Sequence, residues 1–409
     1  MVQDRKKENR NFLLACIGFL TVLSIRFYGG QVNEINSTML AFSYKYGFIS
    51  RGFAGSIYQL LDMLIPVRMD TYGAVMVFTK AVTGVFFVIL VIFFYNCLKR
   101  SGEGEISRIQ YLAVFYLMMA APFFVTKYNF GRLDIYMLML SLMGAMILMA
   151  GRGEWLLVPI VSVAVMIHQG YVFMYLNILL VLLFVKVCDS RENERRRYLA
   201  ILFSVFLTAS VLFLWFELFS HVNGRQAYDQ VVSLAKSLCR DGESIHWDVI
   251  DKEILGIDLT EREIPFHLQN AVQFPIFLVL VIPYLVIGWR FLKGMVHMAD
   301  GGIQKCKYFA IAAGSLTILP DLLLKVDFGR WMFAIASYYL IVSMVLLAMS
   351  DTLFCKQSAK LCNWLGRHKG TGALLFVYPL VLQPFCDVSI CHVTAYLAGL
   401  LNDAFLHWW

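Results

Sequence analysis

The stretch WLLVPIVSVAVMIHQGYVFMYLNILLVLLFVKV, residues 155–187, decides the fold class. It is apolar almost throughout, apart from His-Gln-Gly at 168–170, and it is too long for one membrane-spanning helix and short for two. We therefore expect a hairpin of two helices, 155–168 and 171–187, that turns at His168. The first arm would be only about 21 Å long against about 30 Å of hydrocarbon, so His168 would lie below the membrane surface.

Similar apolar runs recur along the whole chain of 409 residues, which is 59% hydrophobic and only 15% charged. A soluble domain carries roughly 25% charged residues. The sequence therefore predicts an all-α, polytopic membrane protein with about 11–12 transmembrane helices in a single integral-membrane domain, residues 1–409. The first run lacks a small-residue cleavage site, which favours a retained signal anchor. The expected spans are 12–28, 72–97, 109–126, 133–150, 155–168, 171–187, 198–220, 269–290, 306–322, 331–349, 371–386 and, less clearly bounded, 389–406.

Basic residues give the expected orientation. With a cytoplasmic N-terminus and alternating spans, 21 of the 35 Lys and Arg residues fall in the inner loops, and the run RENERRRY at 191–198 is the strongest single anchor. The net charge of +7 then reflects membrane topology rather than a nucleic-acid partner. With this topology the unusual polar segments lie on the outer side, where we expect the functional site.

Two of these outer segments are nearly identical hexamers, KYNFGR at 127–132 and KVDFGR at 325–330. An arginine beside a helix N-terminus adds positive charge where the helix dipole already favours an anion, and a phosphate would balance both. Lys127, Arg132, Lys325 and Arg330 are therefore candidate diphosphate ligands. The alternative is that they extend to the membrane surface without a ligand. The repeat suggests two half-sites, an old duplication or chance.

Two further outer segments carry candidate ligands. Residues 43–66 form an outer loop that enters an interfacial or re-entrant helix, and their Lys45 and Arg51 are candidate phosphate ligands, although tyrosines there also suit a plain interfacial anchor. The loop 221–265 is long, mixed in charge and contains one short helical pattern, which is typical of a lid or binding surface. Its candidate substrate contacts are His221, Arg225, His246 and Asp248.

Three side chains are candidate catalytic bases: His168, Asp134 and Glu34. A histidine titrates near neutral pH, but a lone histidine at a turn also serves as a hydrogen-bonding residue. Asp134 would otherwise pair with Arg132 or with a cation across the bundle. No DxD pair, HExxH or CxxC motif is present, so the sequence indicates neither a metal nor another cofactor. Cys386 and Cys391 are close enough in sequence to form a disulfide, or are two buried thiols.

The layout of many spans, a long outer loop in the second half and scattered outward-facing arginines resembles bacterial polysaccharide polymerases of the O-antigen and capsule type (the Wzy/EpsG class), within the wider GT-C-like glycosyltransferases. The residues that match are Arg51, Arg132 and Arg330, with His168 as a base. The first outer loop, GGQVNEINST, contains one acidic residue, Glu34, where metal-dependent GT-C enzymes usually carry an acidic pair.

For such enzymes the resemblance implies metal-free transfer of a glycan from a polyprenyl-diphosphate (undecaprenyl-diphosphate) donor to an acceptor sugar during polysaccharide biosynthesis. The reaction would take place at the outer face of the bacterial cytoplasmic (inner) membrane. The expected partners are the lipid-linked oligosaccharide, membrane lipid, and a chain-length regulator or flippase. Two alternatives stay open, a flippase or transporter for lipid-linked saccharides and a metal-dependent GT-C glycosyltransferase.

Overall fold

The computed structural model describes residues 6–18, 31–112, 130–220, 224–257, 279–324 and 328–382, except 8, 67, 103, 111, 243, 280, 281 and 284. The predicted all-α class is confirmed, because the regular structure in these ranges is helical, with no strand. The predicted spans 109–126, 269–290 and 389–406 lie wholly or mostly outside these ranges, as do Cys386 and Cys391.

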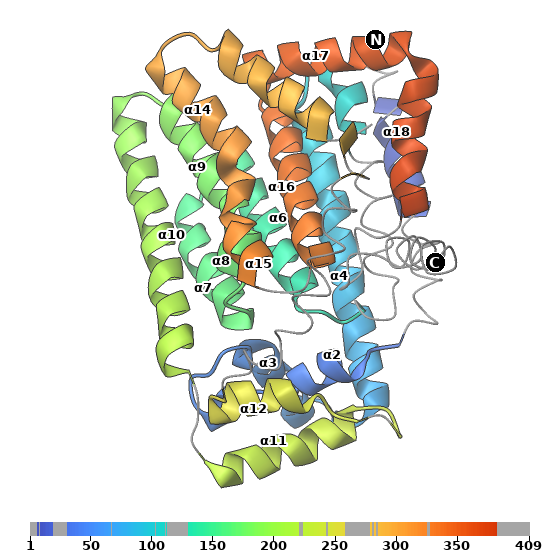
Figure 1. Ribbon diagram of the computed structural model, residues 1–409, viewed down its shortest axis with the longest axis vertical. Coiled ribbons are helices and arrows are strands. Elements are labelled where there is room, and N and C mark those ends of the chain that lie inside the picture. The colour runs from blue at the N-terminus through green and yellow to red at the C-terminus, as the bar shows by residue number, and fades with distance from the viewer. Residues whose placement is uncertain are drawn as a thin grey trace, which may run out of the picture.

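The long helices lie side by side and form the body of the molecule (Figure 1). They include α4 (Tyr72–Arg100), α6 (Asp134–Ala150), α7 (Leu157–Ile167), α9 (Leu176–Asp189), α10 (Glu192–Phe219), α14 (Gly302–Ala313) and α16 (Phe328–Ala348). The turn predicted at His168 is present, and both arms of the hairpin pack against α6 and α10. The second arm is broken at Tyr175, so a short helix α8 (Tyr171–Met174) precedes α9.

Within the described ranges, two helices, α4 and α10, are long and apolar enough to cross a membrane by length and composition. Only 22% of the most apolar window of α10 is buried inside the protein. Its outer face exposes Phe203, Leu207 and Val211, a contiguous apolar surface that lipid would cover. Residues 333–348 of α16 and helix α17 (Thr352–Arg367) would give a third candidate, but they meet at a bend of 111°.

At the end that the sequence places outside, shorter helices form a separate layer across the long ones (Figure 1). This layer consists of α2 (Glu34–Met39), η1 (Tyr44–Tyr46), α3 (Gly52–Leu64), α11 (Arg225–Leu238) and α12 (Trp247–Leu255). The loop predicted to contain one helix therefore contains two. Because α11 and α12 pack on α2, this loop covers the segment that holds Arg51.

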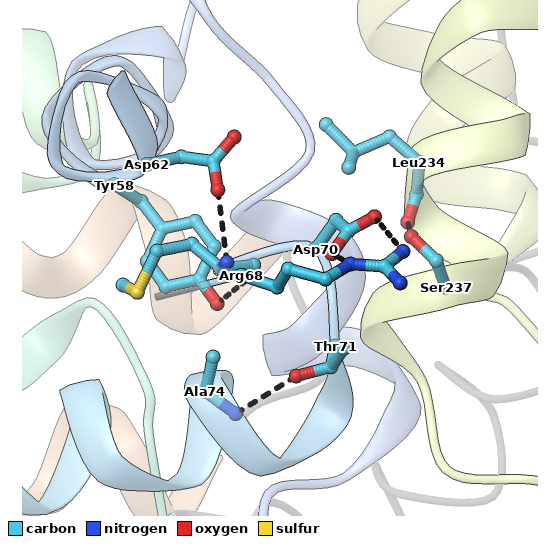
Figure 2. A network of polar contacts seen from close by, with 9 residues as sticks. Tyr58, Asp62, Arg68, Asp70, Thr71, Ala74, Leu234 and Ser237 are labelled. Atoms are coloured by element: carbon cyan, nitrogen blue, oxygen red, sulfur yellow. Dashed lines mark hydrogen bonds and ion pairs between the residues drawn. The ribbon is translucent and has the colours of Figure 1, made fainter. Parts of the chain in front are cut away.

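A polar network fixes the connection from α3 to α4 beside α11 (Figure 2). The Tyr58 hydroxyl donates to the Met69 carbonyl, and the Met69 amide donates to Asp62 Oδ1 at 2.8 Å. Thr71 then caps α4 by accepting from the Ala74 amide at 3.3 Å. These bonds hold α3 against the start of α4.

At the opposite end, a buried ion cluster joins three helices. Lys307 Nζ on α14 lies 2.9 Å from Asp189 Oδ2 at the end of α9 and 2.6 Å from Asp351 Oδ2 at the α16–α17 bend.

The remaining elements are η2 (Glu154–Leu156), η3 (Gly314–Ile318), α15 (Leu319–Leu324) and α18 (Lys369–Leu382).

Gly55 lets α3 approach the preceding segment, and this contact gives a first prediction. A Cβ at Gly55 would lie 1.9 Å from the Phe42 carbonyl oxygen and 2.6 Å from that of Leu40, and backbone cannot move aside as a side chain does. Gly55→Ala should therefore lower the free energy of unfolding by about 1–3 kcal/mol. Gly73→Ala is the matched control, because the nearest atom to its Cβ is 4.0 Å away. Equal melting temperatures of both variants in detergent would contradict this packing.

Candidate functional site

Arg51 stands at the start of α3 in a strained backbone conformation. Its φ of 60° is left-handed, a region that costs a non-glycine residue about 1–3 kcal/mol. Its Nη1 lies 3.3 Å from Glu253 Oε1 on α12, and Glu253 is buried. The helix thus begins on an arginine that points under the outer loop toward a carboxylate.

The preceding residue connects this segment to the membrane hairpin. Ser50 donates to Gln169 Oε1, and both residues are buried. Because Ser50 precedes Arg51 and Gln169 follows His168, this bond brings Arg51 and His168 into the same region.

An ion pair brings the second hexamer to the residue that opens the helix after the first hexamer. Arg330 of the second hexamer makes two parallel hydrogen bonds to Asp134, from Nε to Oδ1 at 3.2 Å and from Nη2 to Oδ2 at 2.9 Å. Asp134 is only two residues beyond Arg132 of the first hexamer, and all three side chains are buried. The partner of Asp134 is therefore a cation across the bundle.

The hexamers nevertheless differ in local structure. Gly131 has a left-handed φ of +89°, and a Cβ there would lie 3.1 Å from Val32 Cγ1, so this glycine meets both a conformational and a packing requirement. The Phe130 carbonyl accepts a hydrogen bond from Asn36 Nδ2 at 2.8 Å, which attaches the first hexamer to α2. In contrast, Phe328–Arg330 already belong to α16.

Positive charges from distant segments converge on His168, which lies in the loop after α7. The half-buried imidazole interacts electrostatically with Arg51, Arg330, Lys252 and Arg132. Its Nδ1 accepts a hydrogen bond from the Gly170 amide at 2.9 Å, so Nδ1 carries no hydrogen and Nε2 carries the hydrogen of the neutral ring. His168 thus presents a hydrogen-bond donor among four cations.

His246, just before α12, belongs to the same region. Its backbone amide donates to Thr38 Oγ1 at 3.2 Å, so it lies against α2. The charges of Glu34, Asp248 and Arg51 all act on its imidazole. Glu34, at the half-buried start of α2, is therefore near His246 and Arg51.

Asp248 is exposed on α12, and its charge acts on the neighbouring imidazole of His246. The other candidate residues lie apart from this cluster or outside the described ranges. Lys45 is exposed and lies 5.7 Å from the Tyr46 ring. Arg225 is exposed at the start of α11 and pairs with Asp229 at 3.4 Å. Lys127, Lys325 and His221 fall outside the residues that the structure describes.

Two charged residues of α12, Lys252 and Glu253, were not predicted as site residues. Glu253 lies between the buried Ile250 and Ile254 on the inner face of an amphipathic helix. A carboxylate at an apolar position of such a pattern is a signal for a buried polar contact. The sequence contained that signal, but its partner Arg51 is 202 positions earlier, so the pairing could not be inferred from spacing.

Several buried polar atoms around the cluster have no hydrogen-bond partner in the described part of the chain. They are Asn36 Oδ1, Ser37 Oγ, Arg51 Nε and His246 Nδ1. Buried polar atoms are normally paired with protein, water or a ligand. Their concentration on α2 and at the starts of α3 and α12 is typical of a site for a polar molecule.

His246 provides a second prediction, on pH. Burial lowers its pKa from 6.5, and Arg51 opposes its protonation, although Asp248 and Glu34 favour it. The unfolded chain therefore binds a proton more readily than the folded chain, so stability is complete above about pH 6.5 and falls as the pH drops through the lowered pKa. In thermal unfolding between pH 8 and 5, His246→Gln should lose less stability on acidification than the wild type. An unchanged slope would contradict the assignment.

No group of three or more metal-ligating side chains that could hold a metal ion occurs among the described residues. The cluster therefore consists of cations, carboxylates, imidazoles and small polar groups.

The chain matches no family model, no curated protein and no solved structure.

Proposed function

We propose that the chain is a metal-independent glycosyltransferase of the polysaccharide-polymerase type. It is a polytopic protein of the bacterial inner membrane, with about 11–12 spans, a cytoplasmic N-terminus and an outward-facing site. It transfers a glycan from a polyprenyl-diphosphate donor to a hydroxyl group of an acceptor sugar. The partners are the lipid-linked oligosaccharide and a chain-length regulator or flippase.

One observation carries this proposal: Arg51, Arg132, Arg330 and Lys252 come from four distant segments and their charges act on one residue, His168. Two carboxylates, Asp134 and Glu253, pair with two of these cations. A lipid-linked diphosphate ester carries two negative charges, which arginine and lysine side chains gathered from several segments are suited to bind.

The donor would compete with Glu253 for Arg51. A guanidinium group binds phosphate through its planar fork of donors. Arg51 makes a single 3.3 Å contact with Glu253 Oε1, whereas Arg330 makes two parallel bonds to Asp134. When Arg51 turns to the diphosphate, the buried Glu253 carboxylate is released beside it. Donor binding thereby frees the Glu253 carboxylate to act as the base in the same event that neutralises the diphosphate leaving group.

The chemical step then follows without a further reactant. The acceptor hydroxyl oxygen forms a bond to the anomeric carbon, and its proton passes to Glu253. The bond from that carbon to the diphosphate oxygen breaks, and the electron pair leaves with the diphosphate. Arg51, Arg132 and the Nε2 hydrogen of His168 stabilise the developing negative charge.

The sugars would occupy the region between α2 and α12. The buried polar atoms there include both donors and acceptors, among them Asn36 Oδ1, Ser37 Oγ and His246 Nδ1. A polyhydroxylated ligand can pair with such a mixed set. An apolar substrate would leave these groups unpaired at a cost of about 1–3 kcal/mol each.

The test is an elongation assay. The purified protein, reconstituted in vesicles, is incubated with a polyprenyl-diphosphate-linked oligosaccharide, with and without EDTA. We expect longer lipid-linked glycans and release of polyprenyl diphosphate in both conditions. Movement of the intact donor across the bilayer with no change in glycan length would identify a flippase instead, and loss of elongation in EDTA would identify a metal-dependent enzyme.

A further inference from the structure

A second candidate binding region lies at the opposite end of the bundle from the cation cluster. An apolar cavity of about 310 Å³ is enclosed by α14, α16, α17 and the helical residues 285–298. Its walls include Phe291, Leu347, Phe354 and Leu361, and Arg108 lies at its edge. The volume is in the range of small-ligand sites, at roughly 300–1,000 Å³.

Arg108 is the cation at this cavity. Its Nη1 donates to Glu105 Oε1 at 3.3 Å and to the Cys355 carbonyl at 3.0 Å, and the thiol of Cys362 is its third contact. These bonds hold the guanidinium beside the apolar walls while part of it stays accessible. A ligand with an anionic head and a hydrocarbon chain would complement this arrangement.

The orientation of α17 indicates where such a ligand comes from. After the 111° bend this amphipathic helix lies across the end of α16, as an interfacial helix does (Figure 1). Phe354 and Leu361 line the cavity, whereas Lys356 and Lys360 are exposed on the same helix. The basic residues of this end are Arg108, Arg290, Lys293, Lys356, Lys360, Arg367 and Lys369, which the sequence places at the cytoplasmic surface.

We propose that this cavity binds an acyl chain of an anionic phospholipid from the cytoplasmic leaflet. The phosphate lies against Arg108 and the lysines of α17, and the chain occupies the space between α16 and α17. Basic pockets between helices on the cytoplasmic side are typical sites for anionic head groups. The proposal is independent of the glycosyltransferase activity, because the cavity and the cation cluster share no residue.

Native mass spectrometry of the detergent-purified chain, offered equal amounts of phosphatidylglycerol and phosphatidylcholine, tests the site. One cation near the surface contributes an about fivefold preference for the anionic lipid, so we expect at least this ratio in the wild type. Arg108→Gln should lower this ratio about fivefold, whereas Arg196→Gln, which replaces an exposed arginine of α10, should leave it unchanged. Ser343→Trp should fill the cavity and abolish retention, whereas Leu207→Trp on the exposed face of α10 should not.

Thiol reactivity gives a readout that needs no variant. Cys362 lines the cavity, and Cys306 is exposed outside it. Phosphatidylglycerol should slow alkylation of Cys362 by N-ethylmaleimide and leave Cys306 unchanged. Equal retention of the two lipids by the wild type, or no protection of Cys362, would overturn the proposal. Displacement of phosphatidylglycerol by an equal amount of undecaprenyl phosphate would overturn the assignment to a phospholipid.

Discussion

Arg51→Gln is expected to slow glycan transfer about 100- to 1,000-fold, the usual effect of removing one group that stabilises charge in the transition state. The variant removes the guanidinium that binds the phosphate in the donor complex. The same group pairs with Glu253 when no donor is bound. Transfer rates are measured at saturating donor by counting glycan repeats per lipid. A rate within about threefold of the wild type would mean that Arg51 does not meet the leaving group.

Two controls separate this effect from a loss of folding. Arg225→Gln is the first control. Arg225 also pairs with a carboxylate in the outer layer, but its side chain is exposed, so the variant should leave the transfer rate unchanged. The double variant Arg51→Gly, Glu253→Gln removes the strained left-handed residue and the buried charge together. It should melt near the wild-type temperature and remain inactive.

Arg330→Ala and Asp134→Ala are each expected to lower the free energy of unfolding by about 3–5 kcal/mol, because each leaves a buried charge without its partner. The pair is almost inaccessible, with side-chain exposures of 9% for Arg330 and 1% for Asp134. The double variant Arg330→Met, Asp134→Leu replaces the pair by apolar groups and should recover most of the stability. Stability is measured by unfolding in mixed micelles with increasing SDS.

The matched control for this cycle is the exposed pair of Arg68 and Asp70 (Figure 2). Arg68→Ala should leave the unfolding curve almost unchanged, because solvent already screens that pair. If Arg330→Ala were as mild as Arg68→Ala, the ion pair between Arg330 and Asp134 would not hold α6 and α16 together.

The sequence predicted the helices whose boundaries depend on local composition. The spans 72–97 and 133–150 correspond closely to α4 and α6, and the polar His-Gln-Gly turn divides the hairpin as expected. The expected span 306–322 is different, because it is divided among α14, η3 and α15. The break falls at Gly314, where a Cβ would lie 2.2 Å from the Tyr338 hydroxyl, a contact 24 residues away that hydropathy does not reveal.

The sequence singled out the residue types of the candidate site but not their pairings. It named Arg51, Arg132 and Arg330 because each lies beside an expected helix start, and the fold brings the three charges near His168, while their binding of a ligand stays a prediction. The partner of Arg330 is 196 residues away, and no local pattern specifies which carboxylate faces which cation. Although the two hexamers share four of six residues, tertiary packing gives Gly131 a left-handed turn and places Phe328–Arg330 in a helix.

The most direct test of the account is a cryo-EM structure of the protein in a lipid nanodisc with bound undecaprenyl diphosphate. The account predicts diphosphate density beneath α12, within hydrogen-bond distance of Arg51 and Arg132, with the contact between Arg51 and Glu253 broken. Diphosphate density elsewhere, with Arg51 still on Glu253, would contradict it.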